Sequence, residues 1–130
     1  MHISITAFYA ALLGLIFVRL STRTIQLRRK VKTALGDGDD AELKRAIRAH
    51  ANFSEYTPIG LLLIGMGENL GTYPLLVHAL GFFLLCGRCL HAYGLSQVKE
   101  DYRFRIFGMK MTLNVIIVSA LAIIWMLIFA

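Results

Sequence analysis

Residues 111–130, with the sequence MTLNVIIVSALAIIWMLIFA, form a run of twenty residues that contains no charged side chain. The hydrocarbon core of a bilayer is about 30 Å thick, and an α-helix needs roughly twenty apolar residues to cross it. Two further runs, 3–18 and 69–87, are also free of charge. These runs predict a membrane protein built from helices.

The composition of the whole chain agrees with this prediction. Of its 130 residues, 57% are hydrophobic and 17% are charged. Soluble domains average about 45–50% apolar residues and about 25% charged residues. The apolar content excludes a disordered chain, and the presence of only two cysteines excludes a disulfide scaffold. The length indicates a single domain.

A fourth apolar run, residues 56–67, is too short to span a bilayer alone. Extended backward through 42–54 it becomes long enough, with its polar first half near one membrane face. The run 3–18 has no basic leader and no small-residue cleavage site after it, so we expect a retained helix.

Turn residues separate these segments, at Gly36-Asp-Gly-Asp-Asp40 and at Gly71-Thr-Tyr-Pro74. Asp40 is placed to cap the second helix. The prediction is one all-α domain over residues 1–130, an integral membrane bundle of four helices at about 3–32, 42–70, 74–95 and 103–129.

The basic residues lie beside two of the three connections. The second connection has none, and the third has Lys99, Arg103 and Arg105, with Lys110 one turn later. By the positive-inside rule we expect the first and third connections in the cytoplasm and both termini outside it. The net charge of +6 then marks orientation, so no nucleic-acid partner is expected. Eight of the fourteen basic residues lie in the first connection and its helix ends: Arg23, Arg28, Arg29, Lys30, Lys32, Lys44, Arg45 and Arg48.

The second helix carries a polar stripe. Arg48, Asn52, Glu55 and Tyr56 are spaced i, i+4, i+7 and i+8, which places them on one helical face. Polar groups in membrane helices are costly and are functional candidates. A guanidinium, an amide and a carboxylate together can hold a zwitterionic ligand. The alternative is a solvated stripe with internal pairs, such as Glu55 with Arg48 or Arg88.

The third helix has its own polar pair, Arg88 and His91, spaced i, i+3. Arg88 is expected to be structural and to need a carboxylate partner, and Glu55 and Glu68 are the only ones within the spans. His91 lies nearer the cytoplasmic end and is the better functional candidate. His78 is expected to form a hydrogen bond between helices. The two cysteines are expected to be buried packing residues, and no metal-ligand spacing is present.

The stretch Arg45-Ala-Ile-Arg48-Ala-His50-Ala-Asn52-Phe-Ser-Glu55-Tyr56-Thr-Pro58 resembles the MAPEG family, membrane-associated proteins in eicosanoid and glutathione metabolism, and is similar to its bacterial branch. The resemblance covers nearly the whole chain. It includes Leu27-Arg28-Arg29, the turn at 36–38, and Gly87-Arg88-x-x-His91-Ala-x-Gly94.

The resemblance implies a homotrimer in the bacterial inner membrane, with glutathione as co-substrate between protomers near the cytoplasmic face. Membrane lipids and a lipophilic small-molecule substrate are the other implied partners. The family's thiolate-stabilising arginine opens the fourth helix, which makes Arg105 the catalytic candidate and Arg103 the alternative. By position, the residues implied to contact glutathione are Arg28, Arg29, Arg48, Asn52, Glu55, Tyr56 and His91.

Three functions are compatible with these residues. The first is a glutathione-dependent transferase or peroxidase acting on lipophilic electrophiles. The second is a non-catalytic glutathione- or lipid-binding protein, because Leu95 stands where eicosanoid members carry a tyrosine. The third is a small transporter that passes protons through Glu55 and Glu68, although a stripe near one membrane face differs from a midplane transport site.

Overall fold

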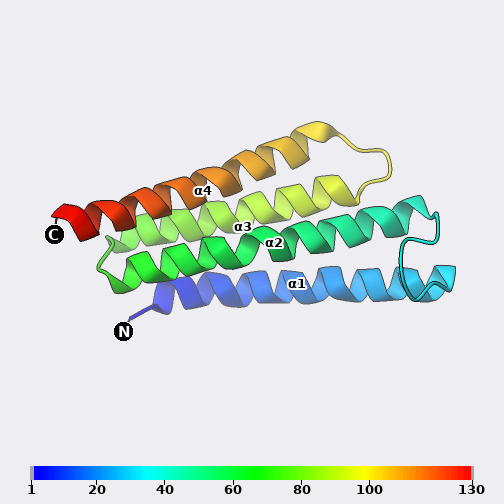
Figure 1. The fold of residues 1–130 in the computed structure, drawn as a ribbon, viewed down its shortest axis with the longest axis horizontal. Coiled ribbons are helices and arrows are strands. Elements are labelled where there is room, and N and C mark those ends of the chain that lie inside the picture. Colours follow the sequence, from blue (N-terminus) through cyan, green and yellow to red (C-terminus); the bar gives the residue numbers. More distant parts are fainter. Residues whose placement is uncertain (1, 130) are drawn as a thin grey trace.

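The computed structural model describes residues 2–129, and this part of the chain forms four α-helices and no strand, as the sequence predicts. The helices lie side by side along the long axis of the molecule (Figure 1). Residues 32–40 and 97–101 connect helices at one end, called the loop end below, whereas the 70–73 turn lies at the other end. The helices are α1 (Ser4–Val31), α2 (Ala41–Asn69), α3 (Pro74–Ser96) and α4 (Tyr102–Phe129).

Three of the helices, α1, α3 and α4, are long and apolar enough to cross a membrane, with 28, 23 and 28 residues. The remaining helix, α2, has 29 residues and packs against all three others. It runs without interruption through Pro58, so the proline does not end the helix. The chain is therefore an all-α integral membrane bundle.

Two carboxylates satisfy backbone donors at helix starts. Asp40 is the N-cap of α2, and its Oδ1 accepts a hydrogen bond from the Leu43 N–H at 2.8 Å. Glu68, near the end of α2, accepts from the N–H groups of Ile5 and Thr6 at 2.9 and 2.8 Å. The first N–H groups of a helix have no partner within the helix and attract negative charge. Glu68 therefore stabilises the start of α1 and does not neutralise an arginine.

The core lies between all four helices, and Leu13 of α1, Phe53 of α2, Leu84 of α3 and Val115 of α4 are among its buried apolar side chains. The hydroxyl of Tyr9 lies 3.4 Å from His78 Nδ1, which agrees with the expected hydrogen bond between helices. Cys89 is exposed in this chain. The expectation that both cysteines are buried was therefore wrong: Cys86 is only half-buried, and Cys89 lies on the α3 face toward a groove beside α1.

Glycines let α3 and α4 approach closely near the loop end. A Cβ placed on Gly108 would lie 2.5 Å from the Gly87 carbonyl oxygen and 2.6 Å from the His91 nitrogen. A Cβ on Gly94 would lie 2.9 Å from the Arg105 nitrogen. Small residues at such positions bring membrane helices into backbone contact. This contact sets the separation between His91 on α3 and Arg105 on α4.

We expect Gly108→Ala to lower the thermal stability of the protein in detergent, because the added methyl group meets backbone atoms that cannot rotate away. Overpacking of this kind costs about 1–3 kcal/mol. The control is Gly14→Ala in α1, where no described atom outside the adjoining residues and backbone of that helix lies within 4 Å of the added group. It should be neutral or slightly stabilising because alanine favours helix. Thermal melting followed by circular dichroism measures both. Equal melting temperatures for Gly108→Ala and the unchanged protein would contradict the close-approach argument.

Candidate functional site

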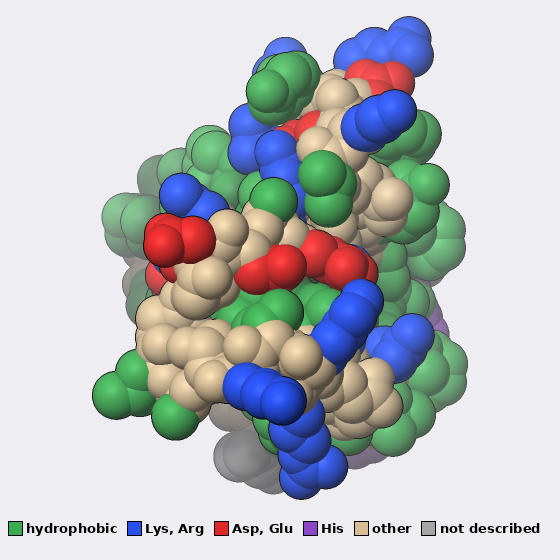
Figure 2. Space-filling view, turned by 90° about the vertical axis from the view of Figure 1, so that its right-hand side faces the viewer, with side chains coloured by type: hydrophobic (Ala, Val, Ile, Leu, Met, Phe, Trp, Pro, Cys, Tyr) green, Lys and Arg blue, Asp and Glu red, His purple; other side chains and the backbone are tan. Residues whose placement is uncertain are grey.

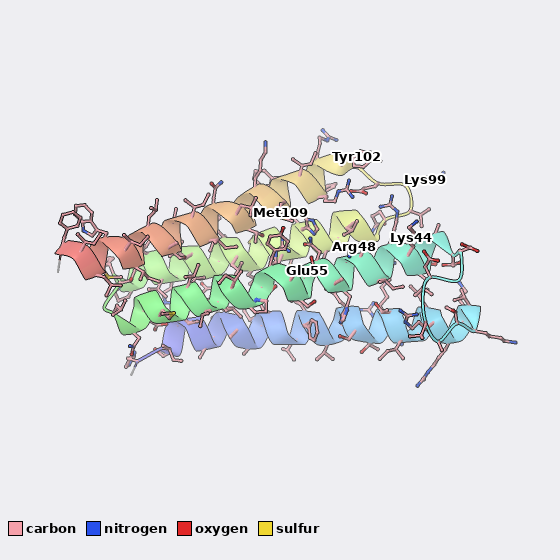
Figure 3. The ribbon with its side chains drawn as sticks, viewed as in Figure 1. Lys44, Arg48, Glu55, Lys99, Tyr102 and Met109 are labelled. Atoms are coloured by element: carbon pink, nitrogen blue, oxygen red, sulfur yellow. The ribbon has the colours of Figure 1, made fainter. Side chains whose placement is uncertain are left out.

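A hollow of about 510 Å³ opens between α2, α3 and α4, in the half of the bundle nearer the loop end. Three of its lining side chains are cationic, Arg48, Arg105 and Lys110, and two more are polar, Asn52 and His91. Figure 3 shows Arg48 and Glu55 along α2, with Arg48 nearer the loops. Apolar side chains complete the wall: Leu95, Ile106 and Met109.

The charges in this hollow favour an anion. No carboxylate is among its described lining residues, while three cationic groups are. Charged side chains of both signs also gather around the loop end, which faces the viewer in Figure 2. Hydrogen bonds to a charged group are about twice as strong as those between neutral groups. A ligand with carboxylates and peptide groups therefore suits the chemistry of the hollow.

Arg88 lies behind the hollow and orients Asn52. It is 1% exposed, and its Nη1 donates to Asn52 Oδ1 at 2.7 Å while its Nε donates to Thr112 Oγ1 at 2.8 Å. Because the Asn52 oxygen is engaged, its amide NH₂ is left to donate to a ligand. The Arg88 guanidinium carbon also lies 5.3 Å from the centre of the Tyr56 ring.

The expected carboxylate partner of Arg88 is not found. Among residues 2–129, Arg88 forms no ion pair, so the prediction of Glu55 or Glu68 as its partner was wrong. An amide, a hydroxyl and an aromatic face solvate the guanidinium instead. Neutral acceptors on three sides replace the single counter-ion that the sequence led us to expect.

Arg105 is held at the edge of the hollow by a buried carboxylate. The Glu100 side chain is 1% exposed; its Oε1 accepts from Arg45 Nη1 at 2.7 Å and its Oε2 lies 3.1 Å from Arg105 Nε. The second contact is an ion pair without a well-aligned hydrogen bond. The Arg105 guanidinium carbon lies 5.1 Å from the centre of the Tyr102 ring. No described residue accepts a hydrogen bond from the Nη groups of Arg105, so both can contact a ligand.

Arg103 lies outside the hollow. Its side chain is 90% exposed, and its Nη2 pairs with Asp101 at 2.8 Å. The side-chain and backbone hydrogen bonds from Arg103 hold the pKa of Asp101 below its usual value. Of the two arginines considered for the catalytic role, the structure brings Arg105 into the hollow and leaves Arg103 exposed in the first turn of α4.

Other predicted ligand contacts are spread over the molecule. His91 is buried and lines the hollow, and its ring forms no hydrogen bond with residues 2–129. Glu55 is exposed and pairs with neither Arg48 nor Arg88 in the described chain. Arg28 donates to the Gly36 carbonyl at 2.7 Å. Together with the exposed Arg29, Arg28 lies on α1, which contributes no residue to the hollow.

Sequence reasoning missed two residues of this site. Lys110 was counted only as a basic charge, although a charge inside the apolar α4 is itself a signal of function. Glu100 gave no signal, because it stands between Lys99 and Asp101 in a charged loop, and charged loop residues are usually exposed. Its burial depends on arginines from two helices that meet only in the folded chain.

Comparison with known proteins gives two results. The sequence matches the profile of the MAPEG family over residues 6–129. It is also 36% identical over 121 residues to the inner membrane protein YecN of Escherichia coli strain K12, an alignment that covers 93% of this chain and 91% of the relative. The YecN protein of Escherichia coli O6:H1, strain CFT073, matches to the same extent.

Proposed function

The chain belongs to the MAPEG family, whose members are glutathione-related transferases or peroxidases, and from this premise we propose that it is a membrane-embedded glutathione-dependent enzyme acting on lipophilic electrophiles. The observation that carries the proposal is the cationic hollow between α2, α3 and α4. Its polar residues fit the functional groups of the tripeptide, and its apolar residues face a substrate that arrives from the bilayer.

Glutathione has two carboxylates, one ammonium group and two peptide-like amides, so its net charge is negative. Arg48 and Lys110 are placed to bind carboxylates, and the NH₂ of Asn52 is placed to donate to a carbonyl. His91 offers a further hydrogen bond from α3. Arg105, whose Nη groups have no hydrogen-bond partner among residues 2–129, is left for the sulfur. The carboxylates, a carbonyl group and the sulfur of the ligand therefore each have a chemically suitable partner in the hollow.

Arg105 acts on the protonation of the thiol. A free thiol has a pKa of about 8.5, and the thiolate is the nucleophile. A guanidinium beside the sulfur in a partly dry site favours the anion. The thiolate then attacks the electrophilic carbon of the second substrate, the carbon–sulfur bond forms, and the leaving group departs with its electron pair.

A second copy of the chain is proposed to complete the site, within a homotrimer. Glu55 is exposed on α2, and no described residue pairs with it. An exposed carboxylate in a membrane helix is costly unless a polar partner covers it. Arg28 and Arg29 lie on α1, away from the hollow of their own chain. A neighbouring protomer that presents α1 to the hollow would bring these arginines to the ligand and cover Glu55.

The inner membrane is the proposed location, since the relative YecN is named an inner membrane protein. The loop end carries most of the basic residues and is placed in the cytoplasm by the positive-inside rule. The two termini then lie on the opposite side of the membrane, and the hollow opens near the cytoplasmic face, where glutathione is available.

Binding and turnover are tested separately. The purified protein in detergent is titrated with glutathione by calorimetry, and is then assayed for conjugation of 1-chloro-2,4-dinitrobenzene and for reduction of cumene hydroperoxide. Binding with turnover supports the enzyme. Binding without turnover supports the alternative, a non-catalytic glutathione-binding protein, which Leu95 in the wall of the hollow favours. Absence of binding contradicts both.

Arg48→Gln should weaken glutathione binding by about tenfold or more, because a hydrogen bond to a charged group contributes about 1.5–3 kcal/mol. The matched control is Lys44→Gln, one turn earlier on α2, where the exposed side chain does not line the hollow (Figure 3). Calorimetric titration of both variants gives the comparison. If the two substitutions weaken binding equally, the effect is general charge attraction and the assignment of Arg48 is wrong.

A further inference from the structure

A second hollow, of about 320 Å³, lies between α1 and α3 and shares no lining residue with the first. One part of its wall is basic and polar, with Arg19 and Arg23 from α1 and Tyr93 from α3. Another part is apolar, with Ile16, Leu20 and Ala92. We call this hollow the α1/α3 groove. Its mixed wall fits a ligand that is charged at one end and apolar at the other.

The α1/α3 groove lies at the level where α3 ends. The Nη2 group of Arg23 lies 3.4 Å from the carbonyl oxygen of Ser96, the last residue of α3. Arg19 is one turn, or about 6 Å, further from the loop end. It is exposed and lies inside a helix that is apolar enough to span a membrane. The charged part of the groove is therefore at the membrane boundary. Its apolar part, which includes Ile16, lies further toward the hydrocarbon.

The charge balance of the α1/α3 groove is positive. Arg23 lies 3.5 Å from Glu42, and the carboxyl end of a helix such as α3 acts as about half a negative charge. Arg19 forms no hydrogen bond or ion pair with any residue in the part of the chain that the structure describes. The two guanidinium groups are therefore opposed by one carboxylate and by the partial negative charge at the end of α3. The net charge of the groove is about half a positive charge, and it is centred on Arg19.

We propose that the α1/α3 groove binds an anionic phospholipid, with the phosphate on Arg19 and Arg23 and an acyl chain along Ile16 and Leu20. A guanidinium without a partner is costly at the edge of the hydrocarbon, and phosphate, the anion that a phospholipid presents at this depth, is bound by this planar group in two-point fashion. The phenol of Tyr93, which is 56% exposed, provides a further donor. A soluble phosphate compound would leave the apolar half of the groove uncovered, which is why the ligand is a lipid.

Native mass spectrometry of the purified protein tests the proposal with two probe lipids of equal chain length, phosphatidylglycerol and phosphatidylcholine. The unchanged protein should retain phosphatidylglycerol with about tenfold higher affinity. Arg19→Gln should weaken this preference, and Arg19→Gln combined with Arg23→Gln should remove it. The matched control is Lys30→Gln, which removes one exposed charge on α1 outside the groove and should keep the preference.

Cys89 lines the α1/α3 groove and reports on its occupancy directly. In a Cys86→Ala background, phosphatidylglycerol should slow the reaction of Cys89 with N-ethylmaleimide several-fold, and phosphatidylcholine should not. Equal retention of the two lipids overturns the proposal. It is also overturned if Lys30→Gln loses the preference for phosphatidylglycerol as much as Arg19→Gln does, because the preference would then reflect general charge attraction. Displacement of the lipid by glycerol phosphate at the same concentration also overturns it, because the site would then recognise soluble phosphate. Glutathione binding is measured in parallel and should not change in any of these variants.

Discussion

Replacing Arg105 with alanine should reduce glutathione transferase turnover by about a hundredfold or more while leaving the assembly and glutathione binding in place. Removal of one group that stabilises a developing anion typically lowers kcat by about 10²–10³. Without the guanidinium, the pKa of the bound thiol moves toward its free value of about 8.5, so the rate of Arg105→Ala should reach half its maximum at higher pH. Measurement of kcat and KM across pH, with glutathione titration by calorimetry, gives both quantities.

Arg103→Ala is the informative comparison, because Arg103 is two residues away and pairs with Asp101 at the surface. Its turnover should remain close to that of the unchanged protein. The reverse result, with activity lost in Arg103→Ala and kept in Arg105→Ala, would reassign the catalytic arginine. Unchanged turnover in both variants would show that neither arginine stabilises the thiolate.

Replacing Glu100 with alanine should lower kcat by about tenfold and lower stability, while glutathione affinity changes much less. The Glu100 side chain, which is 1% exposed, contacts both Arg45 and Arg105. Loss of one partner from a fully buried ion pair costs about 3–5 kcal/mol. The two arginines are 26% and 36% exposed, so solvent screening reduces the expected loss to about 1–2 kcal/mol. The lower kcat follows because Arg105 is then free to leave its place beside the sulfur.

Two further substitutions separate positioning by Glu100 from a general effect of the loop. Glu100→Gln keeps an oxygen for Arg45 but removes the charge between the arginines, so its kcat should fall between those of Glu100→Ala and the unchanged protein. Asp101→Asn removes the neighbouring, solvent-facing partner of Arg103 and should leave kcat unchanged. If Glu100→Ala keeps the melting temperature and kcat of the unchanged protein, Glu100 does not position Arg105.

Local sequence features were sufficient to predict the helices. Long uncharged runs indicate α1, α3 and α4, because only a helix or a closed barrel satisfies its backbone hydrogen bonds in lipid. The acidic turn before Ala41 indicates where α2 begins, and the Asp40 side chain caps it as expected. These features act between residues close in sequence, so they are visible without the folded chain.

The polar stripe on α2 was only partly predictable. Spacing of four residues correctly places Arg48 and Asn52 on one face, and both line the hollow. The same spacing does not reveal that Tyr56 stacks on Arg88, or that Asn52 accepts from it. A helical period determines which side chains share a face, whereas their partners depend on what the neighbouring helices present.

Hydropathy, charge positions and helical spacing were enough to predict a four-helix membrane bundle, the concentration of basic residues at its loop end, and a polar face on α2. The folded chain was needed to show that Arg88 is solvated by neutral groups, that Arg105 rather than Arg103 reaches the hollow, and that the Glu100 side chain is buried between two arginines. Hydropathy and helical spacing are properties of neighbouring residues. The surroundings of a charge depend instead on how closely α3 and α4 approach, and that distance is set by glycines meeting across the two helices.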